Sequence, residues 1–239
     1  MLYRVADLYL EMSALGDMPE RMRSYEAGSG QADISITEQD LDRGGSRFKT
    51  ITNNDLFCYM ETGRVFYNKI IPFDGMMLHA SAVVIDGYAY LFSGPCGMGK
   101  STHAGLYLKA FGDRARIIND DKPALRRIGG VWYAYGTPWC GKDGINLNER
   151  ARLGGICFLK RGDRKITRLA PADVLPLFMP QTERRIEPGL MRLLLPCIDR
   201  LVREVPFFEF YNHADPEDAA VTFAAMREAA KEAANETQS

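Results

Sequence analysis

A short glycine-rich segment constrains the fold of this 239-residue chain more than any other feature of its sequence. Residues 94–101 read GPCGMGKS and match the pattern G-x-x-x-x-G-K-[ST] at every fixed position. A strand-like apolar run, 88–93, precedes the segment, and a helical pattern over 100–111, ended by Gly112, follows it. This order lets several backbone N–H groups and the positive end of a helix face one anion. The sequence therefore predicts a phosphate-binding loop between a strand and a helix.

The residue types in this loop suit contact with phosphate oxygens. Glycines let the backbone curl tightly and approach an anion closely. Lys100 would bring a positive charge to the β- and γ-phosphates of a nucleotide, and the Ser101 hydroxyl would coordinate Mg²⁺. The residues expected to contact the nucleotide phosphates are Gly94, Pro95, Cys96, Gly97, Met98, Gly99, Lys100, Ser101 and Thr102.

Two adjacent carboxylates, Asp120 and Asp121, follow a short strand-like run, 116–119. We expect that strand to return the chain to the glycine-rich loop, so that the two side chains lie at its mouth. One carboxylate could then hold Mg²⁺ while the other takes a proton from an attacking hydroxyl. The alternative is a solvated turn, because Asp-Asp before Lys-Pro is also a good turn sequence.

A histidine, His79, begins a predicted strand over 78–85. The dipeptide Asp86-Gly87 predicts a hairpin turn that joins this strand to the strand ahead of the glycine-rich loop. His79 is therefore either a structural residue at a strand start or a neighbour of the γ-phosphate and Asp120. A second histidine, His103, lies on the helix that follows the glycine-rich loop, and we expect it to be a packing or surface residue.

Composition describes a globular protein without a general attraction for polyanions. Hydrophobic residues make up 46% and charged residues 26%, and 30 basic side chains oppose 31 acidic ones. A net charge of −1 argues against nucleic acid or an anionic membrane surface as partner. The five widely spaced cysteines, without a Cys-x-x-Cys pair, argue against disulfides and structural zinc and favour a cytoplasmic setting. We find no signal-peptide pattern and no apolar run of 18 residues, so we expect no membrane span.

The pattern along the chain predicts a mixed α/β protein, with strands in the middle and helices around them. We expect residues 1–70 to form a strand and helix extension packed on the core, and residues 71–239 to form one catalytic unit. Strands are expected at 3–12, 34–36, 78–85, 88–93, 116–119, 123–128, 131–135, 155–160 and 165–169. Helices are expected from Asn53 or Asn54 to Lys69, at 100–111, at 189–205 with a kink or break at Pro196, and from a cap at Asp215 to about 234.

Two further basic sites are candidates for contact with a substrate. The segment 137–144 could be a substrate loop that presents Lys142 to the γ-phosphate, or a hairpin connection with Trp139 buried. Arg161 and Arg164 follow a predicted strand and could neutralise phosphate charge. The alternative for this arginine pair is a solvated basic turn.

Three segments together resemble one known family. Residues 78–84 (LHASAVV), 91–102 (LFSGPCGMGKST) and 117–121 (IINDD) are similar to the catalytic domain of HPr kinase/phosphorylase, and more widely to the phosphoenolpyruvate carboxykinase-like fold. The resemblance covers about residues 75–170. It implies a mixed β-sheet core with a P-loop and flanking helices. It also implies that residues 94–101 hold the phosphates of ATP, that Asp120 is the catalytic base, that Asp121 lies at the Mg²⁺ site, and that His79 lies beside the catalytic aspartate.

The resemblance thus implies an ATP-dependent kinase that transfers the γ-phosphoryl group to a hydroxyl of a small molecule or of a peptide or protein serine. Its catalytic residues would be Asp120, His79 and Lys100. One alternative is a nucleotide-binding regulatory or assembly module with slow or no phosphoryl transfer, and another is a phosphatase or phosphorolysis enzyme. The acceptor is unidentified at this stage, and a homo-oligomer stays open.

Overall fold

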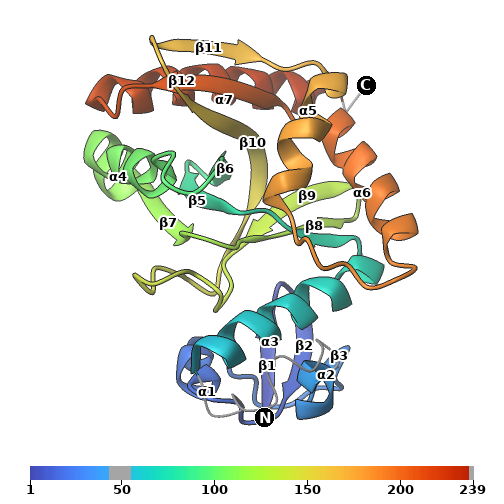
Figure 1. Cartoon of the computed structure of the whole chain (residues 1–239). Coiled ribbons are helices and arrows are strands. Elements are labelled where there is room, and N and C mark those ends of the chain that lie inside the picture. Colours follow the sequence, from blue (N-terminus) through green and yellow to red (C-terminus); the bar gives the residue numbers. More distant parts are fainter. Residues whose placement is uncertain (43–54, 237–239) are drawn as a thin grey trace.

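The computed structural model describes residues 1–42 and 55–236, which form two β-sheets with helices packed around them (Figure 1). The expected helix start at Asn53 or Asn54 lies outside these residues. Among them, a small sheet has the order β1-β2-β3, and a larger, curled sheet has nine strands. The class is mixed α/β, as the sequence pattern predicts.

The small sheet and its helices come from the N-terminal part of the chain. The sequence predicts one strand over 3–12, and this is wrong, because Ala6 and Asp7 adopt positive φ angles of 52° and 59° and turn the chain back on itself. The elements of this part are β1 (Leu2–Val5), β2 (Leu8–Met12), α1 (Met18–Arg21), a 3₁₀ turn (Arg23–Tyr25), β3 (Ile34–Ile36), α2 (Glu38–Asp42) and α3 (Asp55–Lys69).

The larger sheet runs from β4 at one edge through β8, β9, β10, β6 and β5 to β7, and β12 and β11 extend it beside β10. The long strand β10 pairs in parallel with β6 and β12 but antiparallel with β9, so the sheet is mixed. Its strands are β4 (Gly75–Met77), β5 (Ala80–Ile85), β6 (Tyr88–Ser93), β7 (Ala115–Asn119), β8 (Ala124–Ile128), β9 (Val131–Tyr135), β10 (Arg150–Arg161), β11 (Lys165–Arg168) and β12 (Phe207–Asn212).

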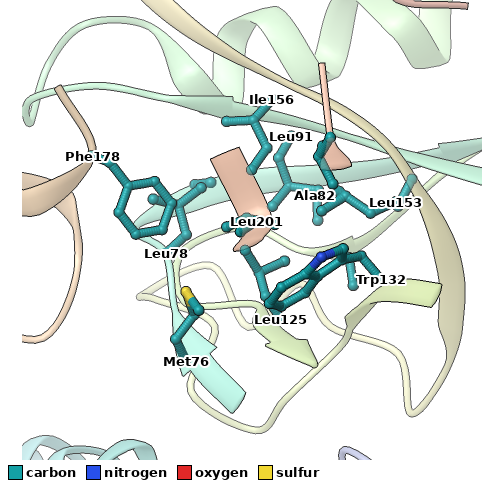
Figure 2. Packing of buried hydrophobic residues seen from close by; sticks show 14 of the residues in the cluster. Met76, Leu78, Ala82, Leu91, Leu125, Trp132, Leu153, Ile156, Phe178 and Leu201 are labelled. Carbon is teal, nitrogen blue, oxygen red and sulfur yellow. The ribbon is translucent and has the colours of Figure 1, made fainter. Parts of the chain in front are cut away.

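Helices cover the larger sheet on both faces. One face carries α4 (Lys100–Phe111) and α7 (Pro216–Glu236), and the other carries α5 (Pro171–Phe178) and α6 (Met191–Glu204). Figure 2 shows the core under α5 and α6, where Phe178 and Leu201 pack against strand residues such as Leu91 and Leu125. The bounds of β6 and α4 are those predicted, α6 continues through Pro196, and α5 and β12 have no counterpart among the predicted elements.

The N-terminal part shares a buried core with the larger sheet. Phe66 on α3 stacks on Trp139, with ring centroids 4.7 Å apart, and the Trp139 indole N–H donates to Thr62 Oγ1 at 3.2 Å. In addition, Arg126 on β8 donates from Nη1 to the carbonyl of Ala6, in the turn between β1 and β2, at 2.6 Å. These contacts fix α3 against the loop that follows β9, which places α3 beside the site described below.

Gly63 in the middle of α3 is explained by the approach of the Trp139 ring. A Cβ at this position would lie 2.8 Å from Trp139 Cδ1, and the ring is held by Phe66 and Thr62. We expect Gly63→Ala to lower the free energy of unfolding by about 1–3 kcal/mol through overpacking, despite the better helix propensity of alanine.

Urea denaturation followed by circular dichroism measures this effect. Gly105→Ala is the matched control, since Gly105 also lies inside a helix but has open space where its Cβ would be. This control should gain up to about 1 kcal/mol. An equal gain in both variants would contradict a tight contact between α3 and Trp139.

No helix within the described part of the chain is long and apolar enough to cross a membrane.

Candidate active site

Three segments that are distant in sequence meet at one edge of the larger sheet. β5 lies between β6 and β7 and is antiparallel to both, with Ala80 opposite Ser93 and Ala82 opposite Asn119. The carboxyl ends of β6 and β7 and the start of β5 therefore share this edge. In addition, Ser93 Oγ donates to His79 O at 2.8 Å. The glycine-rich loop after β6, the acidic pair after β7 and His79 before β5 are thus neighbours, as the sequence analysis anticipates.

The loop 94–99 joins β6 to α4 in a conformation that its glycines permit. Gly94, Gly97 and Gly99 all have positive φ angles, of 147°, 77° and 94°, which residues with a side chain rarely adopt. The space beside Gly97 is open, and a Cβ there would meet no atom within 4 Å. Lys100 Nζ donates to Gly94 O at 3.0 Å and to Pro95 O at 3.3 Å, so the ammonium group lies over the loop.

The electrostatic surroundings of Lys100 connect the loop to the acidic pair. Its side chain is buried, and this burial lowers the pKa of Lys100 below its ordinary value. The nearby carboxyl groups of Asp121 and Asp120 oppose that shift by raising the pKa of Lys100. The ammonium of Lys100 is therefore close enough to both aspartates to interact with them.

The two aspartates have different partners. Ser81 Oγ donates to Asp120 Oδ1 at 2.5 Å. Asp121 Oδ1 lies 3.2 Å from His79 Nε2, and Asp121 Oδ2 accepts from Lys122 Nζ. The resemblance places His79 beside Asp120 as the base, but the imidazole contacts Asp121 instead, and Asp120 is held by Ser81.

The partners of Asp121 keep it ionised. Burial raises the pKa of this carboxyl group, but the hydrogen bond from His79 and the charge of Lys122 outweigh burial and leave the pKa below its ordinary value. Burial lowers the pKa of Lys122, while Tyr59 and Asp121 raise it, and the result is a pKa above the ordinary lysine value. Lys122 also lies over the Tyr59 ring, 5.2 Å from its centroid.

Hydrogen bonds to backbone groups hold the acidic pair in a half-buried turn. Asn119 Oδ1 accepts from the N–H groups of Asp121 and Lys122, at 2.9 and 2.7 Å. The Asp121 carbonyl in turn accepts from Ala80 N–H at 3.1 Å. Ser81, Asn119 and Lys122 were not singled out from the sequence, although the Asx turn at Asn119 is a pattern that could have been found there.

The loop after β9 lies against Asp121. A Cβ on Gly141 would lie 3.2 Å from Asp121 Cβ, and the Gly141 N–H donates to Tyr59 Oη at 2.9 Å. Trp139 is fully buried, whereas Lys142 is exposed one residue beyond Gly141. The prediction of a hairpin connection with Trp139 buried is confirmed, and the prediction that Lys142 faces the γ-phosphate stays a prediction.

The two arginines after β10 differ in their surroundings. Arg161 Nη2 donates to Gly97 O at 3.0 Å, which places this guanidinium on the glycine-rich loop. Arg164 is instead paired with Asp215, Glu217 and Asp218 at the start of α7. These ion pairs hold the start of α7, so the structure gives no support to a phosphate contact at Arg164.

His103 is a packing residue, which is one of the two roles expected for it. Its side chain is buried on α4, and Nε2 lies 3.1 Å from Thr222 Oγ1 on α7. Burial lowers the pKa of His103 to about 4, so the imidazole is neutral at pH 7. It joins α4 to α7 behind the glycine-rich loop.

A cavity of about 490 Å³ opens beside His79 and Asp121. One wall is α3, the end of β4 contributes Met77, and the opposite wall is the segment 180–185. His79 is fixed to that segment, because its N–H donates to Gln181 O at 2.7 Å and its Nδ1 lies 3.3 Å from Gln181 Oε1. Asp121 of the acidic pair therefore lines a cavity that is open to solvent.

The residues present fit a magnesium ion that arrives with a nucleotide. Within residues 1–42 and 55–236, no three His, Cys, Asp or Glu side chains gather in a way that could hold a metal ion by themselves. Mg²⁺ in nucleotide sites needs only one or two carboxylates, since phosphate oxygens and waters complete its shell. Ser101, at the start of α4, and Asp120 or Asp121 would supply such ligands.

Comparison with known proteins finds a similarity in structure but none in sequence. No protein-family model and no curated protein matches the sequence. Among solved structures, the HPr(Ser) kinase/phosphatase from Coxiella burnetii is similar to this chain, with a TM-score of 0.38 and 13% identical residues. The match covers 64% of this chain and 98% of that chain. The relationship to HPr kinases therefore stays at the level of a weak structural similarity.

Proposed function

We propose that this protein is an ATP-dependent kinase that transfers a phosphoryl group to a hydroxyl. The observation that carries the proposal is the register of β5, β6 and β7, which brings the glycine-rich loop, His79 and the acidic pair to one edge of the sheet. Phosphoryl transfer depends mainly on positioning and charge neutralisation, and these residues are of the types required.

The glycine-rich loop would hold the nucleotide phosphates. The backbone N–H groups of residues 97–101 and the positive end of α4 favour anions at this point. On binding, Lys100 would exchange its carbonyl partners, Gly94 and Pro95, for phosphate oxygens. Arg161, bonded to Gly97, would add a second positive charge beside the loop.

We assign the proton acceptor to Asp121 and the metal ligand to Asp120. Asp121 lines the cavity, and its pKa lies below the ordinary value, so a hydroxyl in the cavity could donate to it. Its Oδ1 already lies beside His79 and its Oδ2 beside Lys122, which leaves less room for a metal ion. Asp120 has one oxygen, Oδ1, on Ser81 and its Oδ2 available for Mg²⁺. This exchanges the roles that the family resemblance implies for the two residues.

In the proposed reaction, the acceptor hydroxyl oxygen forms a bond to the γ-phosphorus. The bond from that phosphorus to the bridging β–γ oxygen breaks, and ADP leaves with that oxygen. The hydroxyl proton passes to the Asp121 carboxylate, which His79 and Lys122 hold in place. Bound Mg²⁺ would supply charge neutralisation on the phosphate oxygens.

The direct test incubates the protein with Mg²⁺, γ-labelled ATP and a fractionated cell extract. We expect the label to appear in one fraction as the phosphate ester of an alcohol, which mass spectrometry would identify. Binding of ATP with no labelled product in any fraction would favour a nucleotide-binding module and contradict the kinase proposal. Labelled protein with serine phosphate would assign the acceptor to a macromolecule.

A further inference from the structure

We propose that the cavity beside Asp121 binds the phosphoryl acceptor, and that this acceptor is a small hydroxy acid with an apolar middle. This inference rests on the proposed function. Its hydroxyl would lie at Asp121 and His79, and its anionic group would lie at Arg184 and Arg185 on the opposite wall.

The size and walls of the cavity favour a small molecule. About 490 Å³ is within the range of roughly 300–1,000 Å³ that small-molecule sites occupy. The walls are fixed to each other, because Asn68 on α3 donates to Arg185 O at 3.1 Å and accepts from Glu187 N–H at 2.8 Å. The cavity thus has the size of a small-molecule site and lies between two walls that are held together.

The middle of the cavity is apolar. Tyr59, Met77 and Trp139 contribute to its lining and are themselves almost completely buried. Hydrocarbon placed against these side chains gains about 25 cal/mol for each Å² removed from water. The middle part of the ligand should therefore consist of CH or CH₂ groups rather than of further hydroxyls.

The end of the cavity far from the acidic pair carries an excess of positive charge. Arg64 Nε and Arg185 Nη2 both contact the buried carboxylate of Glu61, at 2.7 and 2.6 Å. With Arg184 and Glu183, which also line the cavity, three arginines oppose two carboxylates, Glu61 and Glu183, and one positive charge stays uncompensated. Beside them, the exposed Arg184 has only a long contact, 3.4 Å, to Pro180 O. One carboxylate or phosphate on the ligand would complete this charge arrangement.

The end of the cavity at Asp121 favours a hydroxyl on the ligand. The Asp121 carboxylate lines the cavity and already pairs with Lys122, and a hydroxyl could donate a further hydrogen bond to it, which an anion could not. The order of groups along the cavity is thus acceptor, apolar wall and cationic wall. A hydroxy acid matches all three.

The test measures binding without nucleotide, so that it does not depend on catalysis. The probes are ω-hydroxyhexanoate and its uncharged analogue hexanediol, and the method is titration calorimetry or ligand-observed NMR. We expect the hydroxy acid to bind at least about tenfold more tightly than the diol. Arg184→Ala should remove this difference, and Arg192→Ala, at an exposed arginine that does not line the cavity, should keep it.

Equal binding of the two probes, or no binding of either, would overturn the inference even if the protein transfers phosphate from ATP. The inference would also be overturned if the protein phosphorylated a serine tripeptide capped at both ends in preference to ω-hydroxyhexanoate. If the hydroxy acid binds as expected but no phosphoryl transfer is found with any acceptor, the cavity stands as an anion-selective site and the kinase proposal fails. The two proposals can therefore be judged separately.

Discussion

Lys100→Met should lower ATP turnover at least about 100-fold, through loss of the positive charge that the loop presents to the phosphates. The Lys100 ammonium lies on the carbonyls of Gly94 and Pro95, where a phosphate would replace them, and methionine keeps most of the length of the side chain without the charge. Steady-state release of ADP and the dissociation constant of ATP are the two measurements. We expect both to be affected, because the charge faces bound and transferred phosphoryl groups alike.

Lys109→Met is the matched control for this prediction. Lys109 lies in the last turn of the same helix, α4, and is exposed to solvent. It should leave turnover within about twofold of the unmodified protein, as exposed substitutions usually have small effects. Full turnover by the Lys100 variant would remove the glycine-rich loop from the proposed site.

Asp121→Asn should reduce phosphoryl transfer about 10²- to 10⁴-fold while it leaves ATP binding in place, since loss of a general base has effects of this size. Asp120→Asn should instead weaken the binding of Mg²⁺ and so raise the concentration of metal needed for half-maximal activity. The reason is that Asp121 lines the cavity and contacts His79, whereas Asp120 is held by Ser81. Single-turnover rates and Mg²⁺ titrations of the two variants separate these effects.

The pH profile gives an independent check of this assignment. Because His79 and Lys122 leave the pKa of Asp121 below its ordinary value, the residue should be ionised at all pH values above the normal carboxylate range. Activity should then stay level as the pH falls from 7 to about 5, and decline only below the ordinary aspartate pKa of about 4. A large loss of transfer in the Asp120 variant, with no loss in the Asp121 variant, would restore the roles that the family resemblance implies.

Much of the central fold is legible in the sequence because local signals and tertiary structure agree there. The Asp86-Gly87 turn, the apolar run of β6 and the glycine-rich loop each have a single structural solution, and the structure has the expected bounds for β6 and α4. The proximity of His79 to the acidic pair follows from hairpin geometry, so it too was anticipated. The sequence and the family resemblance name Asp120 as the aspartate beside His79, whereas the imidazole contacts Asp121, because the directions of adjacent side chains after a strand depend on the exact turn.

Other features depend on contacts between residues that are distant in sequence, and no local pattern reveals these. The turn at Ala6 and Asp7 uses positive φ angles that such residues rarely adopt, so the hairpin was read as one strand. Likewise, the cavity wall at 180–185 is tied to α3 through Glu61 and Asn68, across more than a hundred residues of chain. The charged residues of that wall have no motif and could be found only from the structure.

The ion pairs of Glu61 with Arg64 and Arg185 also bear on how the acceptor specificity of such a protein could change. The wall that would select the acceptor comes from α3 and the 180–185 segment, whereas the loop that would hold the nucleotide comes from β6 and α4. Substitutions inherited in one region need not disturb the other. Substitutions in α3 and in the segment 180–185 could therefore change the acceptor during evolution while the binding of the nucleotide was retained.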